Sequence, residues 1–438
     1  MSSLFSARTP LILCLSVALT GCGDADTPQT DTAETGATQT APAEKSSPKQ
    51  QAGQLVEQAI AQIKDQKFDD AIASLNKAVE TDQQNAEASF QRAGILADVG
   101  QDQLALSDYS RAIEINPNDV RYRNMRGLFL LTRSQLDQAL TDFNEAVRID
   151  PKYIQAWNNR GLVKLAKADF HAAIDDFNKA VEIDPTYADG FNNRGFAWFK
   201  TEVYDKALAD FDKTLELRPG YVNALNNRGM LHLRLNQHRD AVTDFSEAIA
   251  QDENNPKHYQ NRMTAFAALG MDENAQADRN RIQWLIKLGQ INNLVAQTPQ
   301  KPDGYIQRAS HLAEAGKHEV ALVNYEQAIK LASDKATPWT SRAKYWLQQG
   351  EFAKAIADAT KAIETEFSHP ALSIRGDAFL QQGDYDRAIA DYAAAKRLDP
   401  GVAQAYYRRA LLRREQGNES GFRSDFEIAR QLDPQIGQ

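Results

Sequence analysis

The chain has 438 residues, with 50 lysines and arginines against 59 aspartates and glutamates, and therefore a net charge of −9. An acidic balance of this kind gives no basic face that could displace counterions from a nucleic acid, so we expect no nucleic-acid partner. The only cysteines are Cys14 and Cys22. The residues after Cys22 therefore contain neither a disulfide nor a cysteine metal site.

The first stretch of the chain is typical of an export signal. Arg8 precedes an apolar run from Leu11 to Leu19, which is too short to span a bilayer as a helix. The four residues Leu19-Thr20-Gly21-Cys22 resemble a bacterial lipobox. That resemblance implies cleavage before Cys22 and lipidation of its sulfur, which would anchor the protein to a membrane. An ordinary signal peptide with a chance cysteine is the alternative.

The residues around the predicted lipidation site bear on location and on the start of the folded part. Gly23 follows the cysteine, and by resemblance to the lipoprotein sorting rule this favours the periplasmic side of the outer membrane over the inner membrane. Residues 23–51 are rich in Thr, Ala, Gln, Pro and Ser and lack aromatic residues, so we expect a disordered tether. The sequence thus predicts a lipoprotein signal peptide over residues 1–21 and a lipidated cysteine with its tether over residues 22–51.

A single unit, best seen from Trp157 to Pro185, recurs along the rest of the chain. Small residues and apolar residues at i, i+3 and i+4 predict two amphipathic helices, and Asp184-Pro185 ends the second. A helix-turn-helix unit that returns every 34 residues resembles the tetratricopeptide repeat. The resemblance implies an all-α, right-handed superhelix (α-solenoid) of about eleven repeats between residues 52 and 436. The units begin near Ala52, Ala86, Val120, Ile154, Ala188, Val222, Pro256, Pro302, Ala336, His369 and Ala403.

The seventh unit differs from its neighbours. It carries Gln276, Arg279 and Gln283 at positions where an inner repeat is apolar or aromatic, and the only insertion follows it. Because the outer face of a terminal repeat is polar, we predict two arrays, residues 52–289 with seven repeats and residues 302–436 with four, joined by residues 290–301. Sequence drift inside one continuous superhelix is the alternative.

Two columns of opposite charge run through the units. An arginine occupies the same slot in ten units, and in nine of them an aspartate follows sixteen residues later, whereas Arg308 faces Asn324. This spacing predicts structural ion pairs inside each repeat, and a paired guanidinium is not available to a phosphate or acidic ligand. The predicted pairs are Arg92 with Asp108, Arg126 with Asp142, Arg160 with Asp176, Arg194 with Asp210, Arg228 with Asp244, Arg262 with Asp278, Arg342 with Asp358, Arg375 with Asp391, and Arg409 with Asp425.

A column of amides marks the candidate binding site. In tetratricopeptide proteins the first helices line a concave groove, and here the groove positions of successive units carry asparagines beside apolar residues. By resemblance to the asparagine ladder of the sugar-transferring tetratricopeptide proteins, we predict contacts with an extended peptide or partner protein. Solvated surface asparagines beside an apolar column that packs between helices are the alternative. The predicted groove residues are Asn124, Asn158, Asn159, Asn192, Asn193, Asn226, Asn227 and Asn261, with Leu128, Leu162, Phe196 and Met230.

Nearly every residue after 51 fills a repeat slot, which leaves no room for a catalytic domain. We found no phosphate loop, nucleophile elbow or metal-ligand spacing, so we expect no catalytic residue, metal, cofactor or small-molecule substrate. The sequence therefore predicts a membrane-anchored envelope scaffold, an adaptor that binds a protein or extended peptide. A structural subunit of an envelope assembly or secretion complex is the second reading, and an enzyme is the third.

Overall fold

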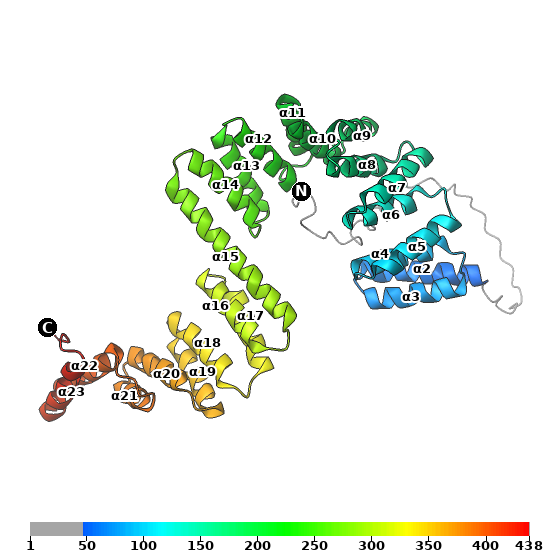
Figure 1. Ribbon diagram of the computed structural model, residues 1–438. Coiled ribbons are helices and arrows are strands. Elements are labelled where there is room, and N and C mark those ends of the chain that lie inside the picture. The colour runs from blue at the N-terminus through cyan, green and yellow to red at the C-terminus, as the bar shows by residue number, and fades with distance from the viewer. Residues whose placement is uncertain (1–46, 438) are drawn as a thin grey trace, which may run out of the picture. The chain divides into compact units, whose positions relative to one another are not determined.

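The computed structural model describes residues 47–437, and all regular structure in that range is helical (Figure 1). The helices form eleven successive pairs, so the predicted all-α repeat architecture is confirmed. The first helices of the pairs are α2 (Pro48–Lys64), α4 (Ala86–Asp98), α6 (Val120–Thr132), α8 (Ile154–Ala166), α10 (Ala188–Lys200), α12 (Val222–Arg234), α14 (Pro256–Ala268), α16 (Pro302–Glu314), α18 (Ala336–Gln348), α20 (His369–Gln382) and α22 (Pro400–Glu415).

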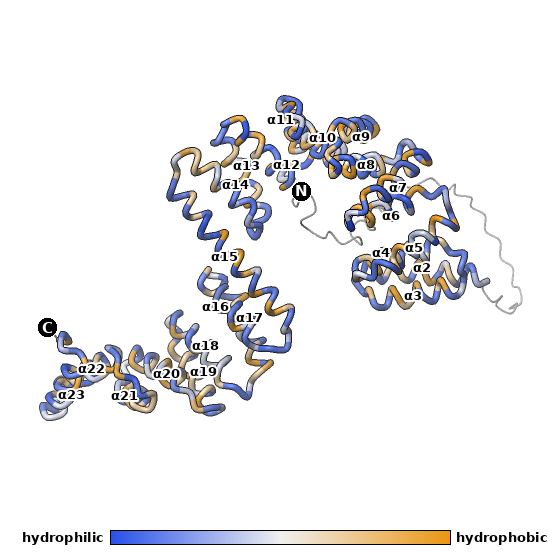
Figure 2. Tube along the Cα trace, in the orientation of Figure 1, coloured by the Kyte–Doolittle hydropathy of each residue, from blue (hydrophilic) through white to orange (hydrophobic). Residues whose placement is uncertain are grey.

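The second helices follow after short turns, and hydrophobic and hydrophilic residues alternate along the helices (Figure 2). They are α3 (Phe68–Thr81), α5 (Asp102–Ile115), α7 (Leu136–Ile149), α9 (Phe170–Ile183), α11 (Tyr204–Leu217), α13 (His238–Gln251), α15 (Asp272–Gln297), α17 (His318–Leu331), α19 (Phe352–Thr365), α21 (Tyr385–Ala394) and α23 (Glu419–Leu432).

Most first helices begin at the residue that the repeat spacing predicts, but α2 and α22 begin earlier. The α2 helix starts at Pro48, where Ser47 forms a capping box with Gln50, and α22 starts at Pro400 behind the cap of Asp399. Proline suits the first turn of a helix because its missing N–H has no partner there in any case. The predicted tether was therefore too long, since residues 48–51 are helical. The predicted signal peptide, Cys22 and most of the tether lie outside the described residues.

A close contact between a glycine and an aromatic ring fixes how the two helices of a repeat cross. A methyl group added at Gly161 would lie 2.6 Å from Phe177 Cε1, and one at Gly195 would lie 2.8 Å from Phe211 Cε1. Both rings are fully buried. The first helix therefore needs glycine at these positions to let the ring of the second helix reach its backbone.

The turn inside each repeat also has a constant geometry. One residue in every repeat lies in the left-handed region, such as Ala168 with φ 62° and Gly350 with φ 75°. Glycine adopts this conformation without strain, and other residues pay a steric cost. Ala168 adopts this conformation despite its steric cost, because packing of the two helices fixes the shape of the turn.

The described residues divide into two compact units, which meet between Ala275 and Gln276 within α15. The predicted division lay later, with residues 290–301 joining the arrays 52–289 and 302–436. The residues predicted as a joint are mostly helical, because α15 continues to Gln297.

The sequence of α15 explains this extension. Asn292 accepts a bond from Arg308 Nη1 at 3.4 Å, and Val295 packs on Gly304 of α16. The end of α15 thus acts as the preceding second helix for the eighth repeat, so the insertion lengthens a helix instead of adding a loop.

The middle of α15 contains a glycine that packing does not require. Gly289 is exposed, and a methyl group there would meet nothing within 4 Å. Because alanine loses less backbone entropy in a helix, we expect Gly289→Ala to raise the free energy of unfolding of the second unit by about 0.5–1 kcal/mol. Urea denaturation followed by circular dichroism measures this change.

Gly376→Ala in the same unit is the control, since its methyl group would lie 2.6 Å from Tyr392 Cε1. That variant should be destabilised. Equal effects of the two substitutions would contradict this account of the helix.

Candidate partner-binding site

The column arginines make bidentate ion pairs with the aspartates of their own repeats. Arg194 donates from Nε to Asp210 Oδ2 at 2.8 Å and from Nη2 to Oδ1 at 2.7 Å. The same contact occurs in the repeats of Arg92, Arg126, Arg160, Arg228, Arg342, Arg375 and Arg409, as the sixteen-residue spacing predicts. Arg308 instead donates to Asn324 Oδ1 at 2.6 Å. These guanidiniums are thus occupied inside the fold.

Because these pairs are buried, the loss of either partner would be energetically costly. The Asp210 side chain is 8% exposed, and burial raises the pKa of Asp210 while the hydrogen bond from Arg194 lowers it. The hydrogen bond to Asp108 raises the pKa of Arg92. Asp278, the predicted partner of Arg262, is also buried. A buried carboxylate without its cation would be strongly destabilising.

The arginines have a second role that the sequence reasoning missed, which is to join successive repeats. Arg194 Nη1 donates to Asn178 Oδ1 at 2.9 Å, and Asn178 lies on the second helix of the preceding repeat. The same bond, always to the residue sixteen positions earlier, is made by Arg92, Arg126, Arg160, Arg228, Arg262 and Arg308. The sequence carried a signal for five of these seven bonds, because their acceptors stand two positions after a column aspartate, as Asn178 does after Asp176.

The asparagines form a second chain of bonds between repeats, on the first helices. Asn159 donates to Asn124 Oδ1 at 3.0 Å, Asn193 to Asn158 Oδ1 at 2.9 Å, and Asn227 to Asn192 Oδ1 at 3.0 Å. Within a repeat, Asn192 donates to Asn193 Oδ1 at 3.3 Å. Amides therefore link α6, α8, α10 and α12 continuously.

This chain corrects part of the predicted groove. Asn124, Asn158 and Asn192 are only 4–5% exposed, so they serve the fold and do not face a ligand. Asn226 is likewise engaged, since it donates to Val222 O at 2.9 Å. The neighbouring asparagines, one position later in each repeat, are half-buried: Asn159, Asn193, Asn227 and Asn261.

Half-buried apolar residues lie beside these half-buried asparagines. Leu128, Leu162, Phe196 and Met230 pack with one edge against the core clusters of their repeats and leave the rest of the side chain accessible. Asn193 and Phe196 are three residues apart and therefore share one face of α10. We call this surface of α8, α10 and α12, with its half-buried asparagines and apolar residues, the amide face.

Next to the end of the amide chain on α12, a histidine contacts Asn226. His258 Nδ1 lies 3.0 Å from Asn226 Oδ1, and the ring is buried. Burial lowers the pKa of His258, and Asp252, whose carboxylate lies 3.6 Å from Nε2, opposes that shift. The neutral ring is thus the form that the fold favours.

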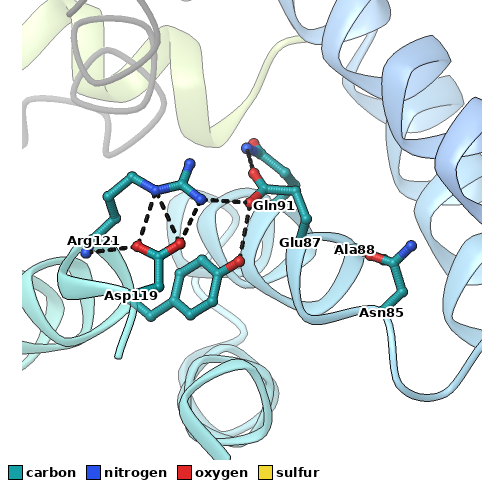
Figure 3. Close-up of polar contacts among 7 residues, drawn as sticks. Asn85, Glu87, Ala88, Gln91, Asp119 and Arg121 are labelled. Atoms are coloured by element: carbon teal, nitrogen blue, oxygen red, sulfur yellow. Dashed lines mark hydrogen bonds and ion pairs between the residues drawn. The ribbon is translucent and has the colours of Figure 1, made fainter. Parts of the chain in front are cut away.

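At the other end, charged groups replace the amides (Figure 3). Arg121 Nη2 bridges Asp119 Oδ2 at 2.7 Å and Glu87 Oε2 at 3.0 Å, and the Tyr122 hydroxyl donates to Glu87 Oε2 at 3.1 Å. Gln91 donates to the other Glu87 oxygen at 2.6 Å. Burial, followed by the carboxylates of Glu87 and Asp119, raises the pKa of Tyr122 far above its ordinary value. The cluster joins α4 to α6 and was not predicted from the sequence.

Residues 47–437 give no sign of two other kinds of site. No helix there combines the length and the apolarity needed to cross a bilayer. Nor does that part of the chain gather three or more histidine, cysteine, aspartate or glutamate side chains in a geometry suited to a metal ion.

Family models for the tetratricopeptide repeat match most of the repeats. One described as "Tetratricopeptide repeat" matches residues 154–187, another of that description matches residues 56–120, 199–256 and 306–369, and one described as "TPR repeat" matches residues 129–167 and 376–417. Together these matches cover more than half of the chain, which therefore belongs to the tetratricopeptide-repeat family. Repeats of this family generally mediate protein–protein interactions and bind peptides.

Several solved structures are similar to parts of the chain. The chain is similar to Pseudomonas aeruginosa pilF, with 18% identity, a TM-score of 0.44, and coverage of 49% of this chain and 96% of that one. It is also similar to a tetratricopeptide repeat protein from Parabacteroides merdae, with 17% identity, a TM-score of 0.38, and coverage of 68% and 99%. For YrrB, described as a TPR protein with an unusual peptide-binding site, these values are 21%, 0.34, 41% and 92%. No curated protein matches the chain.

The surroundings of the column aspartates predict unequal costs for losing their arginines. Arg194→Leu leaves Asp210 buried without a cation, so we expect a loss of about 3–5 kcal/mol in the free energy of unfolding. Arg160→Leu should cost clearly less, because Lys164 Nζ lies 2.7 Å from Asp176 Oδ2 and remains as a partner. Urea denaturation of both variants tests this order.

The double variant Arg194→Leu with Asp210→Leu should recover most of the loss, because it removes the stranded charge. Strictly additive losses in that cycle would show that the two side chains do not stabilise each other.

The buried histidine beside Asn226 predicts a pH dependence. Because its pKa in the folded state lies below the unfolded value of about 6.5, protonation favours the unfolded chain. The stabilisation is present above that pH and declines as the pH falls below it. We expect the parent to lose more free energy of unfolding between pH 8 and pH 5, at about constant ionic strength, than His258→Gln does. Parallel curves for the two proteins would count against this role of His258.

Proposed function

We propose that this protein is a membrane-anchored scaffold of the bacterial cell envelope, which holds an extended segment of a partner protein on the amide face. The observation that supports this proposal is the unused bonding capacity of the half-buried asparagines. Asn193 donates one N–H to Asn158 and accepts one bond from Asn192. A carboxamide has two donors and two acceptor sites, so one of each remains for a ligand.

The arrangement of the amide face suits a polypeptide backbone. Asn159, Asn193 and Asn227 repeat once per unit, and their orientation is fixed by bonds to the preceding repeat. An oriented amide with a donor and an acceptor matches the peptide group whatever the partner's sequence. Leu162, Phe196 and Met230 beside them offer apolar contacts for side chains. Preorganisation of this kind lowers the entropy cost of binding.

The envelope part of the proposal rests on the N-terminal sequence. The resemblance of Leu19-Thr20-Gly21-Cys22 to a lipobox supports lipidation of Cys22, and Gly23 supports the outer membrane. A scaffold tethered in this way would gather partners at the membrane surface.

The amide face predicts the effect of a triple substitution. Asn159, Asn193 and Asn227 changed together to alanine should lose a backbone contact each, about 0.5–1.5 kcal/mol apiece, and so weaken partner binding by about one to three decades. The partner is first captured by crosslinking in the native envelope and then titrated against purified parent and variant. Because the same asparagines also bond to the preceding repeat, the variant should be somewhat less stable than the parent.

The matched control removes bonds between repeats from the other helices. Asn76, Asn144 and Asn178 each accept a bond from a column arginine, so their triple change to alanine should destabilise the array to a similar extent. It should leave partner binding intact. Equal binding by parent and the amide-face variant would rule out that face as the site.

Membrane attachment gives a separate prediction. We expect Cys22→Ser protein to leave the membrane fraction and enter the soluble fraction, because the lipid on the cysteine sulfur is the proposed anchor. Cys14→Ser, in the same signal segment, is the control and should still pellet with membranes. A Cys22→Ser protein that pellets like the parent would refute lipid anchoring at this residue.

A further inference from the structure

Two first helices of the amide face also carry a cation. On α10, Lys200 follows Asn193 by seven residues, and on α12, Arg234 follows Asn227 by seven. Residues at i, i+3 and i+7 lie on one face of a helix. Each helix therefore presents an amide, an apolar residue and a cation in one stripe, namely Asn193, Phe196 and Lys200, and Asn227, Met230 and Arg234.

Neither cation is neutralised by a close ion pair. Lys200 Nζ lies 5.1 Å from the centre of the Phe196 ring and 5.9 Å from that of Phe199, and the ion pairs of residues 47–437 do not include it. The Arg234 side chain is 63% exposed, donates from Nε to the Tyr204 hydroxyl at 3.4 Å, and contacts the exposed Glu202 at 3.6 Å. Such exposed pairs contribute little, so both cations remain available to an anion.

The repeats next to these two do not carry this cation. The corresponding residues are Thr132 on α6, Ala166 on α8 and Ala268 on α14, whereas the first repeat carries Lys64 on α2. In the fourth repeat the nearest cation is Lys167, which is paired with Asp137 at 2.6 Å. A chain with net charge −9 thus places two adjacent, weakly paired cations beside its best apolar contacts.

We propose that the stripes of α10 and α12 select a polypeptide segment in which acidic side chains flank apolar ones. This inference rests on the proposed function. A segment lying over Phe196 and Met230 has the amides on one side and the cations on the other, because i+7 is about 6 Å further along the helix axis than i+3. Its carboxylates meet Lys200 and Arg234, its apolar side chains meet the ring and the thioether, and its backbone bonds to Asn193 and Asn227.

The experiment uses three labelled peptides that differ only in charge. They are repeats of the triplets Ala-Leu-Asp, Ala-Leu-Asn and Ala-Leu-Lys, titrated against the full chain and followed by fluorescence anisotropy. The acidic peptide should bind tighter than the amide peptide by about tenfold at low salt, and the basic peptide should bind weakest. Because exposed charges are screened, this preference should decline as salt is added.

The variants assign the preference to the two cations. Lys200→Gln should weaken acidic-peptide binding by about two- to fivefold, and its combination with Arg234→Gln should abolish the preference without changing binding of the amide peptide. Lys206→Gln is the matched control, since Lys206 also stacks on a ring, that of Trp198 at 4.4 Å, but lies on a second helix. It should bind all three peptides like the parent.

The outcomes separate this inference from the proposed function. If the acidic and amide peptides bind equally, or if the preference survives the double variant, the inference is overturned while peptide binding stands. If none of the peptides binds, both fail. Binding of phosphatidylglycerol vesicles, but not of the acidic peptide, through Lys200 and Arg234 would overturn the peptide assignment in favour of a lipid surface.

Discussion

The array depends on a guanidinium that bonds in two directions. The column arginine donates from Nε and Nη2 to a buried aspartate on the second helix of its own repeat. Its Nη1 donates to a residue on the second helix of the preceding repeat. Arginine suits this role because its planar fork is always charged and presents donors on several sides at fixed angles. One residue per repeat thus fixes both the pairing of helices and the stacking of repeats.

The amide chain repeats this logic on the first helices. The arginines tie successive second helices to the array, and the asparagines tie successive first helices to one another. A repeat protein has no contacts beyond nearest neighbours, so such links decide how cooperatively it folds. In each Asn-Asn pair, the first asparagine is bonded within the fold. Only the second asparagine keeps a free donor and acceptor for a ligand. The proposed binding surface is therefore a by-product of the stacking bonds and is oriented by them.

Much of this could be predicted from the sequence, because the repeat period makes each position a column with one environment. The helix pairs and the sixteen-residue ion pairs follow from that period. The period does not show which side chains form hydrogen bonds to the neighbouring repeat. Asn178 and Asn158 are as polar as any surface residue in sequence, and only the stacking of repeats shows that they accept bonds from Arg194 and Asn193. The insertion was misread for a similar reason, since Asn292 and Val295 look like spacer residues until their contacts with the eighth repeat are seen.

The most direct test of this account is a double-mutant cycle between repeats, with Arg194→Lys, Asn178→Ala and the combined variant compared by urea denaturation. Lysine keeps a positive charge beside Asp210, but it lacks the forked guanidinium that could also donate to Asn178. The bond between positions 194 and 178 is therefore lost in either single variant. If the arginine joins the repeats, the coupling energy between the two positions should be about 0.5–1.5 kcal/mol. A coupling energy indistinguishable from zero would mean that the bond from Arg194 to Asn178 does not help to hold the repeats together, and it would contradict the central role of the guanidinium.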